Sequence, residues 1–135
     1  MSSMIRLTLA QLAQKLKARE VSAVEVLDAS LAQIHATEKQ ISAYACVLED
    51  RARAAAKQAD ADIGAGHWKG PLHGVPVAVK DLYDMAGVPT TASSRQRTNW
   101  TPERDSAVVR RLQDAGAIIL GKTNTAEFGQ SATCD

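Results

Sequence analysis

The sequence predicts an α/β domain in which a mixed β-sheet is flanked by helices. Three observations favour this fold class. In residues 1–66 the apolar side chains recur mainly at helical spacing. Residues 67–135 contain two short runs of branched apolar residues. Turns with glycine and proline separate these runs from their neighbours. Because such runs are typical of buried strands, we expect the second half to supply the first core elements of the sheet.

Two capping boxes mark the starts of the N-terminal helices. Thr8 is followed three residues later by Gln11, and Ser22 is followed at the same distance by Glu25. A shorter helix after Thr8 has leucines at positions 9, 12 and 16. In the longer helix after Ser22, four apolar residues recur at helical spacing: Val24, Leu27, Leu31 and Ile34. We therefore expect a pair of amphipathic helices at the start of the chain.

A strand, a helix and a second strand are predicted next. The segment "ISAYACVLE", residues 41–49, is typical of a strand. Residues 50–63 form an alanine-rich helical pattern with Arg and Lys facing outward. After a turn region, the segment "VPVAVKD", residues 75–81, fits a short buried strand.

The last predicted elements are a helix and a strand. Thr101 and Pro102 are typical of an N-cap and a first helical residue, and we expect this helix to run through Leu112. Gly116 is expected to end the helix. The segment "AIILG", residues 117–121, then predicts a buried strand.

The segment "GAIILGKT", residues 116–123, matches the pattern G-x-x-x-x-G-K-[ST] of a phosphate-binding P-loop. A working P-loop needs a strand, then a flexible loop, then a helix whose N-terminus faces the phosphates. Here the predicted order is helix, turn, strand, and the supposed loop consists of Ala, Ile, Ile and Leu. Branched apolar residues prefer a strand and would crowd converging backbone N–H groups. We therefore interpret the match as coincidental.

Composition excludes several classes of function. The chain has 135 residues, of which 45% are hydrophobic and 23% are charged, and its formal charge is +1. These values are typical of one soluble globular domain and give no electrostatic reason to expect nucleic acid or an anionic membrane as a partner. No apolar run approaches the roughly 20 residues of a membrane span, and the N-terminus lacks the apolar core of a signal peptide. We therefore expect a cytoplasmic protein.

The cysteines and histidines predict neither a disulfide framework nor a metal site. Cys46 and Cys134 are expected to stay reduced, and no activating base is visible for Cys134. His35, His67 and His73 lack metal-ligand spacing to one another or to a cysteine. We expect His73 to be a turn residue. No cofactor and no metal are predicted.

Lys80 is the main candidate for chemistry. It closes the apolar segment "GVPVAVKD", so we expect its stem to be held in an apolar layer. Desolvation lowers the pKa of a lysine from about 10.4, and a lysine that is neutral near pH 7 can accept a proton from a hydroxyl. The alternative is a strand-end lysine that reaches water or pairs with Asp81, and spacing alone favours this alternative. Lys122 and Glu127 are expected to be structural residues.

A family resemblance favours the catalytic interpretation of Lys80. The segments "GPLHGVPVAVKDLYDMAGVPTTASS" and "DSAVVRRLQDAGAIILGKTNTAEFGQSATCD" resemble the amidase signature family, which includes the A subunit of the tRNA-dependent amidotransferases. The resemblance is strong from Gly70 to Asp135 and weaker in the leading helices. It implies that Lys80 is the catalytic base of a Ser–cis-Ser–Lys triad, which attacks a carboxamide through an acyl-enzyme. It also implies that Gly129 and Gln130 lie beside the acyl pocket as substrate-binding positions.

The chain departs from the family in one important respect. Both serines of the triad belong to a glycine- and serine-rich stretch that lies in the family beyond the position of Asp135. Ser93 and Ser94 in "TTASS" lack the flanking glycines of that stretch. We therefore expect residues 1–135 to be the N-terminal part of one amidase-type domain, with an incomplete sheet and no activity on its own.

The sequence leaves three functions open. The first is an amidohydrolase that cleaves the C–N bond of a small-molecule amide. The second is the A subunit of a tRNA-dependent glutamine amidotransferase, which needs partner subunits. The third is a catalytically dead fragment or assembly piece. The expected partners are accordingly an amide substrate and either a second copy or the remainder of the chain, without nucleic acid or membrane.

The interpretation of "GAIILGKT" predicts that the protein does not bind ATP. Calorimetric titration with ATP is expected to show no saturable heat, and Lys122→Ala is expected to change nothing in this result, because the segment does not form a phosphate-binding loop. Micromolar binding of ATP that disappears in Lys122→Ala would contradict the interpretation.

Overall fold

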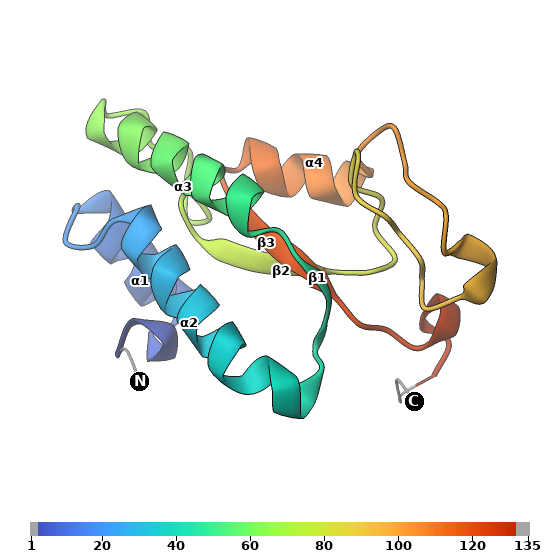
Figure 1. The fold of residues 1–135 in the computed structure, drawn as a ribbon. Helices are drawn as coiled ribbons and strands as arrows, with labels where there is room; N and C mark the ends of the chain where they lie inside the picture. Colours follow the sequence, from blue (N-terminus) through green and yellow to red (C-terminus); the bar gives the residue numbers. More distant parts are fainter. Residues whose placement is uncertain (1–2, 132–135) are drawn as a thin grey trace.

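A three-stranded mixed sheet lies at the centre of the computed structural model, which describes residues 3–131 (Figure 1). Within that range the strands are β1 (Tyr44–Val47), β2 (Pro76–Lys80) and β3 (Ile118–Thr123), in the spatial order β1-β3-β2. β1 runs antiparallel to β3, and β2 runs parallel to β3. This mixed sheet, with helices packed against it, confirms the fold class that the sequence predicts.

Four α-helices and three short 3-10 helices accompany the sheet in the described part of the chain. Their bounds are Ser3–Arg6 (η1), Leu9–Lys17 (α1), Ala23–Ile41 (α2), Glu49–Gly64 (α3), Arg95–Arg97 (η2), Ala107–Asp114 (α4) and Glu127–Gly129 (η3). α1, α2 and α3 pack on one face of the sheet, and α4 packs on the other (Figure 1). Among these helices none is long and apolar enough to cross a membrane.

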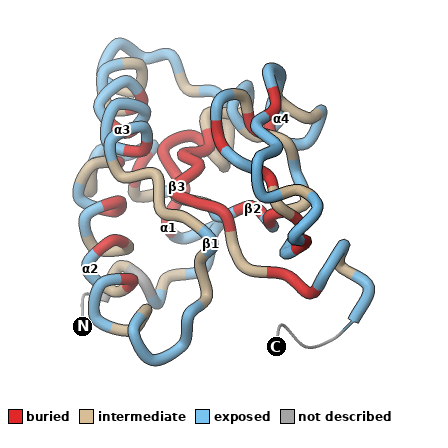
Figure 2. The backbone as a smooth tube through the Cα atoms, turned by 45° about the vertical axis from the view of Figure 1, so that its right-hand side comes forward, coloured by how far each residue is buried: buried red, intermediate tan, exposed pale blue. Residues whose placement is uncertain are grey.

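β3 is apolar without alternation because protein covers both of its faces. Ile118 and Leu120 belong to a core shared with α1, α2 and α3, whereas Ile119 packs with Val109 of α4. The three β3 side chains are at most 5% exposed, and the buried course of the strand is visible in Figure 2. Burial of a side chain of this size stabilises a protein by about 1.5–3 kcal/mol relative to exposure. The predicted strand is therefore confirmed, and it continues to Thr123.

Both predicted capping boxes are present. The Gln11 N–H donates to Thr8 Oγ1 at 3.3 Å, and the Thr8 N–H donates to Gln11 Oε1 at 2.9 Å. Ser22 and Glu25 make the same pair of hydrogen bonds, at 3.1 Å and 2.8 Å. The backbone N–H of Ser22 lowers the pKa of the Glu25 carboxyl. These local hydrogen bonds fix the residues at which α1 and α2 begin.

The start of α4 differs from the sequence expectation. Thr101 and Pro102 lie in a loop, and the helix begins after Ser106, whose hydroxyl accepts a hydrogen bond from the Val109 N–H at 3.4 Å. The Pro102 carbonyl accepts instead from the N–H of Gly87, at 2.9 Å. A hydrogen bond between segments distant in sequence thus holds Pro102 outside the helix, and a second capping residue nearby begins it.

The segment that matches the P-loop pattern has the predicted order of helix, turn and strand. Gly116 has a φ of +83° and forms the turn that follows α4. Gly121 lies inside β3, where an added Cβ would come within 2.5 Å of the Cys46 carbonyl oxygen in β1. Both glycines therefore serve the backbone packing of the sheet, and Lys122 extends from a strand rather than from a phosphate-binding loop.

The sheet leaves β1 and β2 as edge strands in the described part of the chain, because each pairs only with β3. Unpaired strand edges invite pairing with other chains. We expect the isolated 135-residue chain to self-associate, with the apparent mass in sedimentation velocity rising with concentration. A single monomeric species over a wide concentration range, together with one cooperative unfolding transition, would contradict this expectation.

Candidate active site

Lys80 is the last residue of β2, as the sequence predicts, but its side chain is exposed. The preceding residue, Val79, is buried at 4% exposure because successive side chains of a strand point to opposite faces. The expectation that the stem of Lys80 lies in an apolar layer is therefore wrong for the described residues. Within residues 3–131 the ammonium of Lys80 has neither an ion-pair nor a hydrogen-bond partner.

Gly129 lies close to Lys80 in space. An added Cβ on Gly129 would lie 3.6 Å from Lys80 Nζ and 2.8 Å from Leu82 Cδ1. Gln130 follows directly and is exposed, and its backbone N–H donates to the Glu127 carbonyl at 3.2 Å. The structure thus brings Lys80 and Gly129 together at the end of β2, with Gln130 beside Gly129 in the chain.

The segment around Gly129 has an unusual backbone. Phe128 and Gly129 both have positive φ angles, of 50° and 70°. The Phe128 N–H donates to the Ala92 carbonyl at 2.9 Å, and the side chain of Phe128 is 45% exposed. A large non-glycine residue in the left-handed region is held there by its surroundings, and such positions cluster at functional sites.

A second left-handed segment contacts the first. Ala92 and Ser93 have φ angles of 51° and 54°, and the Ala92 N–H donates to the Asp81 carbonyl at 3.0 Å. The loop that contains "TTASS" is therefore ordered by hydrogen bonds to the end of β2. Nothing in the sequence signals this geometry, because alanine and serine rarely take the left-handed conformation.

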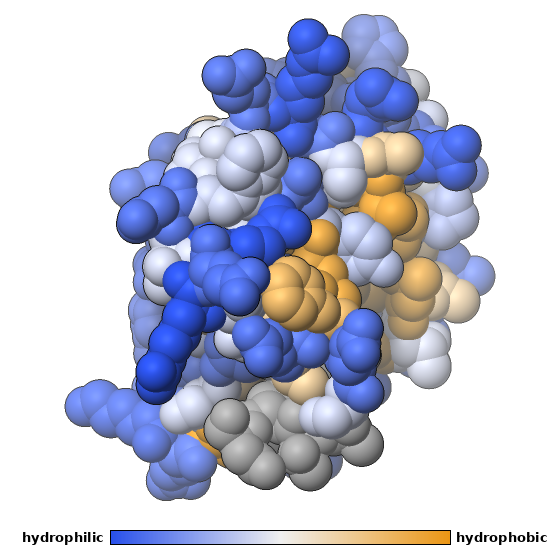
Figure 3. All heavy atoms as spheres, turned by 90° about the vertical axis from the view of Figure 1, so that its right-hand side faces the viewer, coloured by the Kyte–Doolittle hydropathy of each residue, from blue (hydrophilic) through white to orange (hydrophobic). Residues whose placement is uncertain are grey.

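Apolar side chains gather on the face of the molecule toward which η2 and η3 lie, and hydrophilic side chains surround them (Figure 3). The exposed large hydrophobic residues of the chain include Phe128 of η3 and also Tyr83, which follows β2 closely. Phe128 is the chain neighbour of Gly129, which lies near Lys80, and an exposed apolar ring close to a lysine suits a ligand with both an apolar part and a polar reacting group.

Asp81 does not pair with Lys80. Its Oδ1 lies 2.6 Å from Nζ of Lys122, and both side chains are buried, at 2% and 0% exposure. Asp81 Oδ2 accepts hydrogen bonds from the backbone N–H and the hydroxyl of Thr91, at 3.1 Å and 2.7 Å. Lys122 thus makes a structural contact, as expected, but sequence reasoning missed its pairing with Asp81.

The other candidates do not contribute to a reactive centre. His73 lies in a turn, as predicted, and its ring is 1% exposed beside Trp68, with ring centroids 5.6 Å apart. Burial, together with the charge of Lys69, lowers the pKa of His73. The described residues contain no group of three side chains able to hold a metal ion. Cys134 lies outside the described residues.

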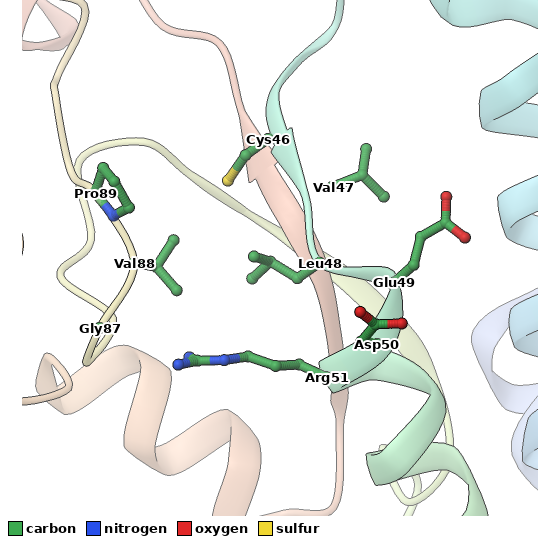
Figure 4. A pocket seen from close by; sticks show the side chains of 9 residues that line it. All are labelled: Cys46, Val47, Leu48, Glu49, Asp50, Arg51, Gly87, Val88 and Pro89. Carbon is green, nitrogen blue, oxygen red and sulfur yellow. The ribbon is translucent and has the colours of Figure 1, made fainter.

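A groove of about 600 Å³ lies away from Lys80, between β1, the start of α3 and the loop at residues 87–89 (Figure 4). Arg51 reaches across it and donates to the Ala86 carbonyl at 2.9 Å. Cys46 lines the groove, and burial raises the pKa of its thiol. Since the thiolate is the nucleophile, a thiol with a raised pKa is a poor one. The groove therefore does not compete with Lys80 as a site of covalent chemistry.

The family model for amidase matches residues 25–135. The chain therefore belongs to the amidase family, the amidase signature enzymes that its two motif segments resemble.

Individual relatives agree with this assignment. An amidase of Pseudomonas putida is 75% identical over 128 residues, which are 95% of this chain and 27% of the relative. The A subunit of the glutamyl-tRNA(Gln) amidotransferase of Anaeromyxobacter dehalogenans is 47% identical over 128 residues, covering 95% of this chain and 26% of that protein. The solved structure of the native peptide amidase from Stenotrophomonas maltophilia matches with a TM-score of 0.86 at 32% identity, over 93% of this chain and 26% of that one. The chain thus spans about a quarter of the length of these relatives.

Because Gly129 approaches Lys80 closely, we expect Gly129→Ala to impair the amide turnover that is proposed below for the full-length protein. The added Cβ must displace Leu82, and alanine at a φ of +70° costs about 1–2 kcal/mol of strain. A shift of about 1 Å at a reacting centre can lower a rate 10²-fold, so we expect kcat/KM to fall by about 10- to 100-fold. The matched control is Gly64→Ala, because an added Cβ there meets nothing within 4 Å. Equal turnover in the two variants would show that the Gly129 segment does not position Lys80.

Proposed function

We propose that the full-length protein containing this chain is an amidohydrolase that cleaves a carboxamide C–N bond, with Lys80 as its general base. The observation that carries the proposal is the state of Lys80. Its ammonium stands without a partner in the described residues, at a strand end and next to the left-handed Gly129 segment. Lys122 differs from Lys80 in this respect, because its buried ammonium holds a carboxylate and a carbonyl.

The proposed reaction is an acyl transfer. Neutral Lys80 takes the proton of a bridging serine, which in turn takes the proton of a second serine. The second serine oxygen attacks the amide carbonyl carbon, and the C–N bond breaks as the leaving nitrogen receives the proton held by Lys80, returned through the bridging serine. Water then attacks the acyl-enzyme and releases the carboxylic acid. Both serines belong to the part of the family fold that follows the segments matched here, so this chain supplies only the base.

Gly129 and Gln130 are proposed to bind the substrate near its acyl carbon. A Cβ on Gly129 would meet Leu82 Cδ1 at 2.8 Å and come into van der Waals contact with Lys80 Nζ at 3.6 Å, so the glycine leaves the space beside Lys80 open for the reacting group. The exposed ring of Phe128 would contact an apolar part of the substrate. We propose a small amide with an apolar portion as the substrate class.

A second candidate function follows from the 47% identity to the A subunit of a glutamyl-tRNA(Gln) amidotransferase. In that case the ammonia released from glutamine would pass to another acceptor instead of being lost, and partner subunits would be required. The 75% identity to an amidase favours simple hydrolysis. Ammonia release from simple carboxamides by the purified full-length protein alone would support the amidohydrolase, and ammonia release only from glutamine in the presence of partner subunits would support the amidotransferase.

The proposal predicts that Lys80→Ala in the full-length protein abolishes nearly all turnover of carboxamides while the fold survives. The side chain is exposed, so its removal leaves the packing of β2 intact, but it removes the group that activates the serines. General-base assistance is worth about 10² to 10⁴ in rate, and more when members of a triad act as a unit. Steady-state turnover is measured beside circular dichroism of the same samples.

The variant Lys80→Arg tests whether Lys80 acts by accepting a proton or only by carrying a positive charge. A guanidinium stays protonated and cannot accept the proton, so we expect this variant to be as inactive as Lys80→Ala. The exposed lysine of α3, Lys57→Arg, is the matched control and should keep full turnover. Near-normal turnover in a folded Lys80→Arg variant would rule out the general-base role. Inactivity of the wild-type full-length protein toward all carboxamides would favour a catalytically dead protein.

A further inference from the structure

Asp81, the residue that follows Lys80 in the chain, is part of a buried ion pair. The ammonium of Lys122, from β3, lies 2.6 Å from Asp81 Oδ1. It also donates to Thr90 Oγ1 at 2.5 Å and to the Pro89 carbonyl at 2.9 Å. Lys122 is the sole partner of Asp81 Oδ1 among the described residues. The other contacts of the Lys122 ammonium come from the loop at residues 89–91, and Asp81 Oδ1 accepts no hydrogen bond among the described residues beyond this ion-pair contact.

Stability alone does not account for a pair of this kind. Taking two charges out of water is costly, and replacing a buried ion pair by neutral residues of similar volume is often neutral or stabilising. An apolar pair could hold β3 to the loop equally well. What an apolar pair could not do is control the charge beside Lys80, which is adjacent to Asp81 in the chain.

The position of Asp81 makes this charge important. If its carboxylate were unpaired, it would stabilise the ammonium form of the neighbouring Lys80. If Lys122 were unpaired, its ammonium would favour the neutral form of Lys80 instead. With both present, the two charges cancel at short range, and Lys80 has no counter-ion among residues 3–131.

We propose that Lys122 is a positioning residue of the active site, which binds the carboxylate of Asp81 so that Lys80 has no counter-ion and can act as a base. The inference rests on the proposed function of Lys80. The same contact also places the loop, because Asp81 holds Thr91 through Oδ2 and Ala92 through its carbonyl. Ala92 in turn accepts from Phe128, next to Gly129. Lys122 thereby sets both the charge and the geometry around Lys80.

Other charged groups near the pair do not change this argument. The titratable group that β1 places next to the pair is the Cys46 thiol, because Cys46 is the register partner of Lys122 on the neighbouring strand. Burial raises the pKa of Cys46, so it carries no charge near neutral pH. The loop contributes only the hydroxyls of Thr90 and Thr91 and the Pro89 carbonyl. The charge beside Lys80 is therefore set by Asp81 and Lys122.

The sign of the expected effect differs between the two partners. In Lys122→Met, the Asp81 carboxylate keeps both hydrogen bonds from Thr91 but loses its cationic partner, so its negative charge favours protonated Lys80. The acidic limb of kcat/KM against pH, which reports the essential base of the free enzyme, then moves to higher pH. In Asp81→Asn, the ammonium of Lys122 keeps two acceptors and the limb moves to lower pH. We expect a shift of about one pH unit in each direction, within the range that a neighbouring charge produces.

The experiment measures kcat/KM of the full-length protein against pH for wild type, both single variants and the double variant Lys122→Met/Asp81→Asn. In the double variant both charges are gone, and we expect the acidic limb to return to the wild-type position. Lys57→Met, on the exposed face of α3, controls for loss of a lysine and should leave the limb in place. Circular dichroism and thermal unfolding establish the folded fraction of each variant.

Opposite shifts in the single variants and a restored limb in the double variant support the inference. A folded Lys122→Met whose turnover falls equally at all pH values, with an unmoved limb, overturns it, because that is the result of a purely structural role. If Lys122→Met does not fold, Asp81→Asn is compared with the double variant instead. A limb that is lowered in Asp81→Asn and restored in the double variant supports the inference, and equal limbs overturn it. The variant Lys80→Arg distinguishes failure of the proposed function from failure of this inference. If Lys80→Arg turns over amides, Lys80 is not the base, regardless of the positions of the acidic limbs.

Discussion

The enclosure of β3 is the constraint on which the other described elements depend. The strand has β1 and β2 on its two edges, the core of α1, α2 and α3 on one face and α4 on the other. Such a position admits no polar side chain without a partner. It also requires Gly121, because the backbone of β1 at Cys46 passes too close for a Cβ. The buried Lys122 follows this rule, because its ammonium contacts the Asp81 carboxylate, the Thr90 hydroxyl and the Pro89 carbonyl inside the protein.

The elements that could be predicted from the sequence are those specified by neighbouring residues. Thr8 and Ser22 each cap a helix through a partner three residues later in the chain. The uninterrupted apolar run of β3 indicates by itself that the strand is buried on both faces. The start of α4 could not be predicted in the same way. Thr101 and Pro102 are a good local signal, but the carbonyl of Pro102 is bound by Gly87, so a contact between distant segments decides the outcome.

The same distinction between local and long-range contacts applies to the residues of the candidate site. Lys80 could be found because it closes an apolar strand and because the surrounding segment resembles a known family. Its exposure, the approach of Gly129 and the pairing of Asp81 with Lys122 could not be found, since each joins segments that are distant in sequence. The left-handed backbone at Ala92 was also hidden, because it is held by partners rather than favoured by its own residue type.

Asp81 joins three segments through both its backbone and its side chain. Its N–H donates to the Thr123 carbonyl of β3, its carbonyl accepts from Ala92, and its carboxylate binds Lys122 and Thr91. Opening the contact between the carboxylate and Lys122 would leave two buried charges unpaired, which makes opening of this region costly. The amide hydrogens of Asp81, Thr91 and Ala92 therefore belong to one cooperative unit for exchange with solvent, which opens as a whole rather than by fraying of the loop. A loop on the surface of the molecule thus acquires the rigidity of the sheet that it adjoins.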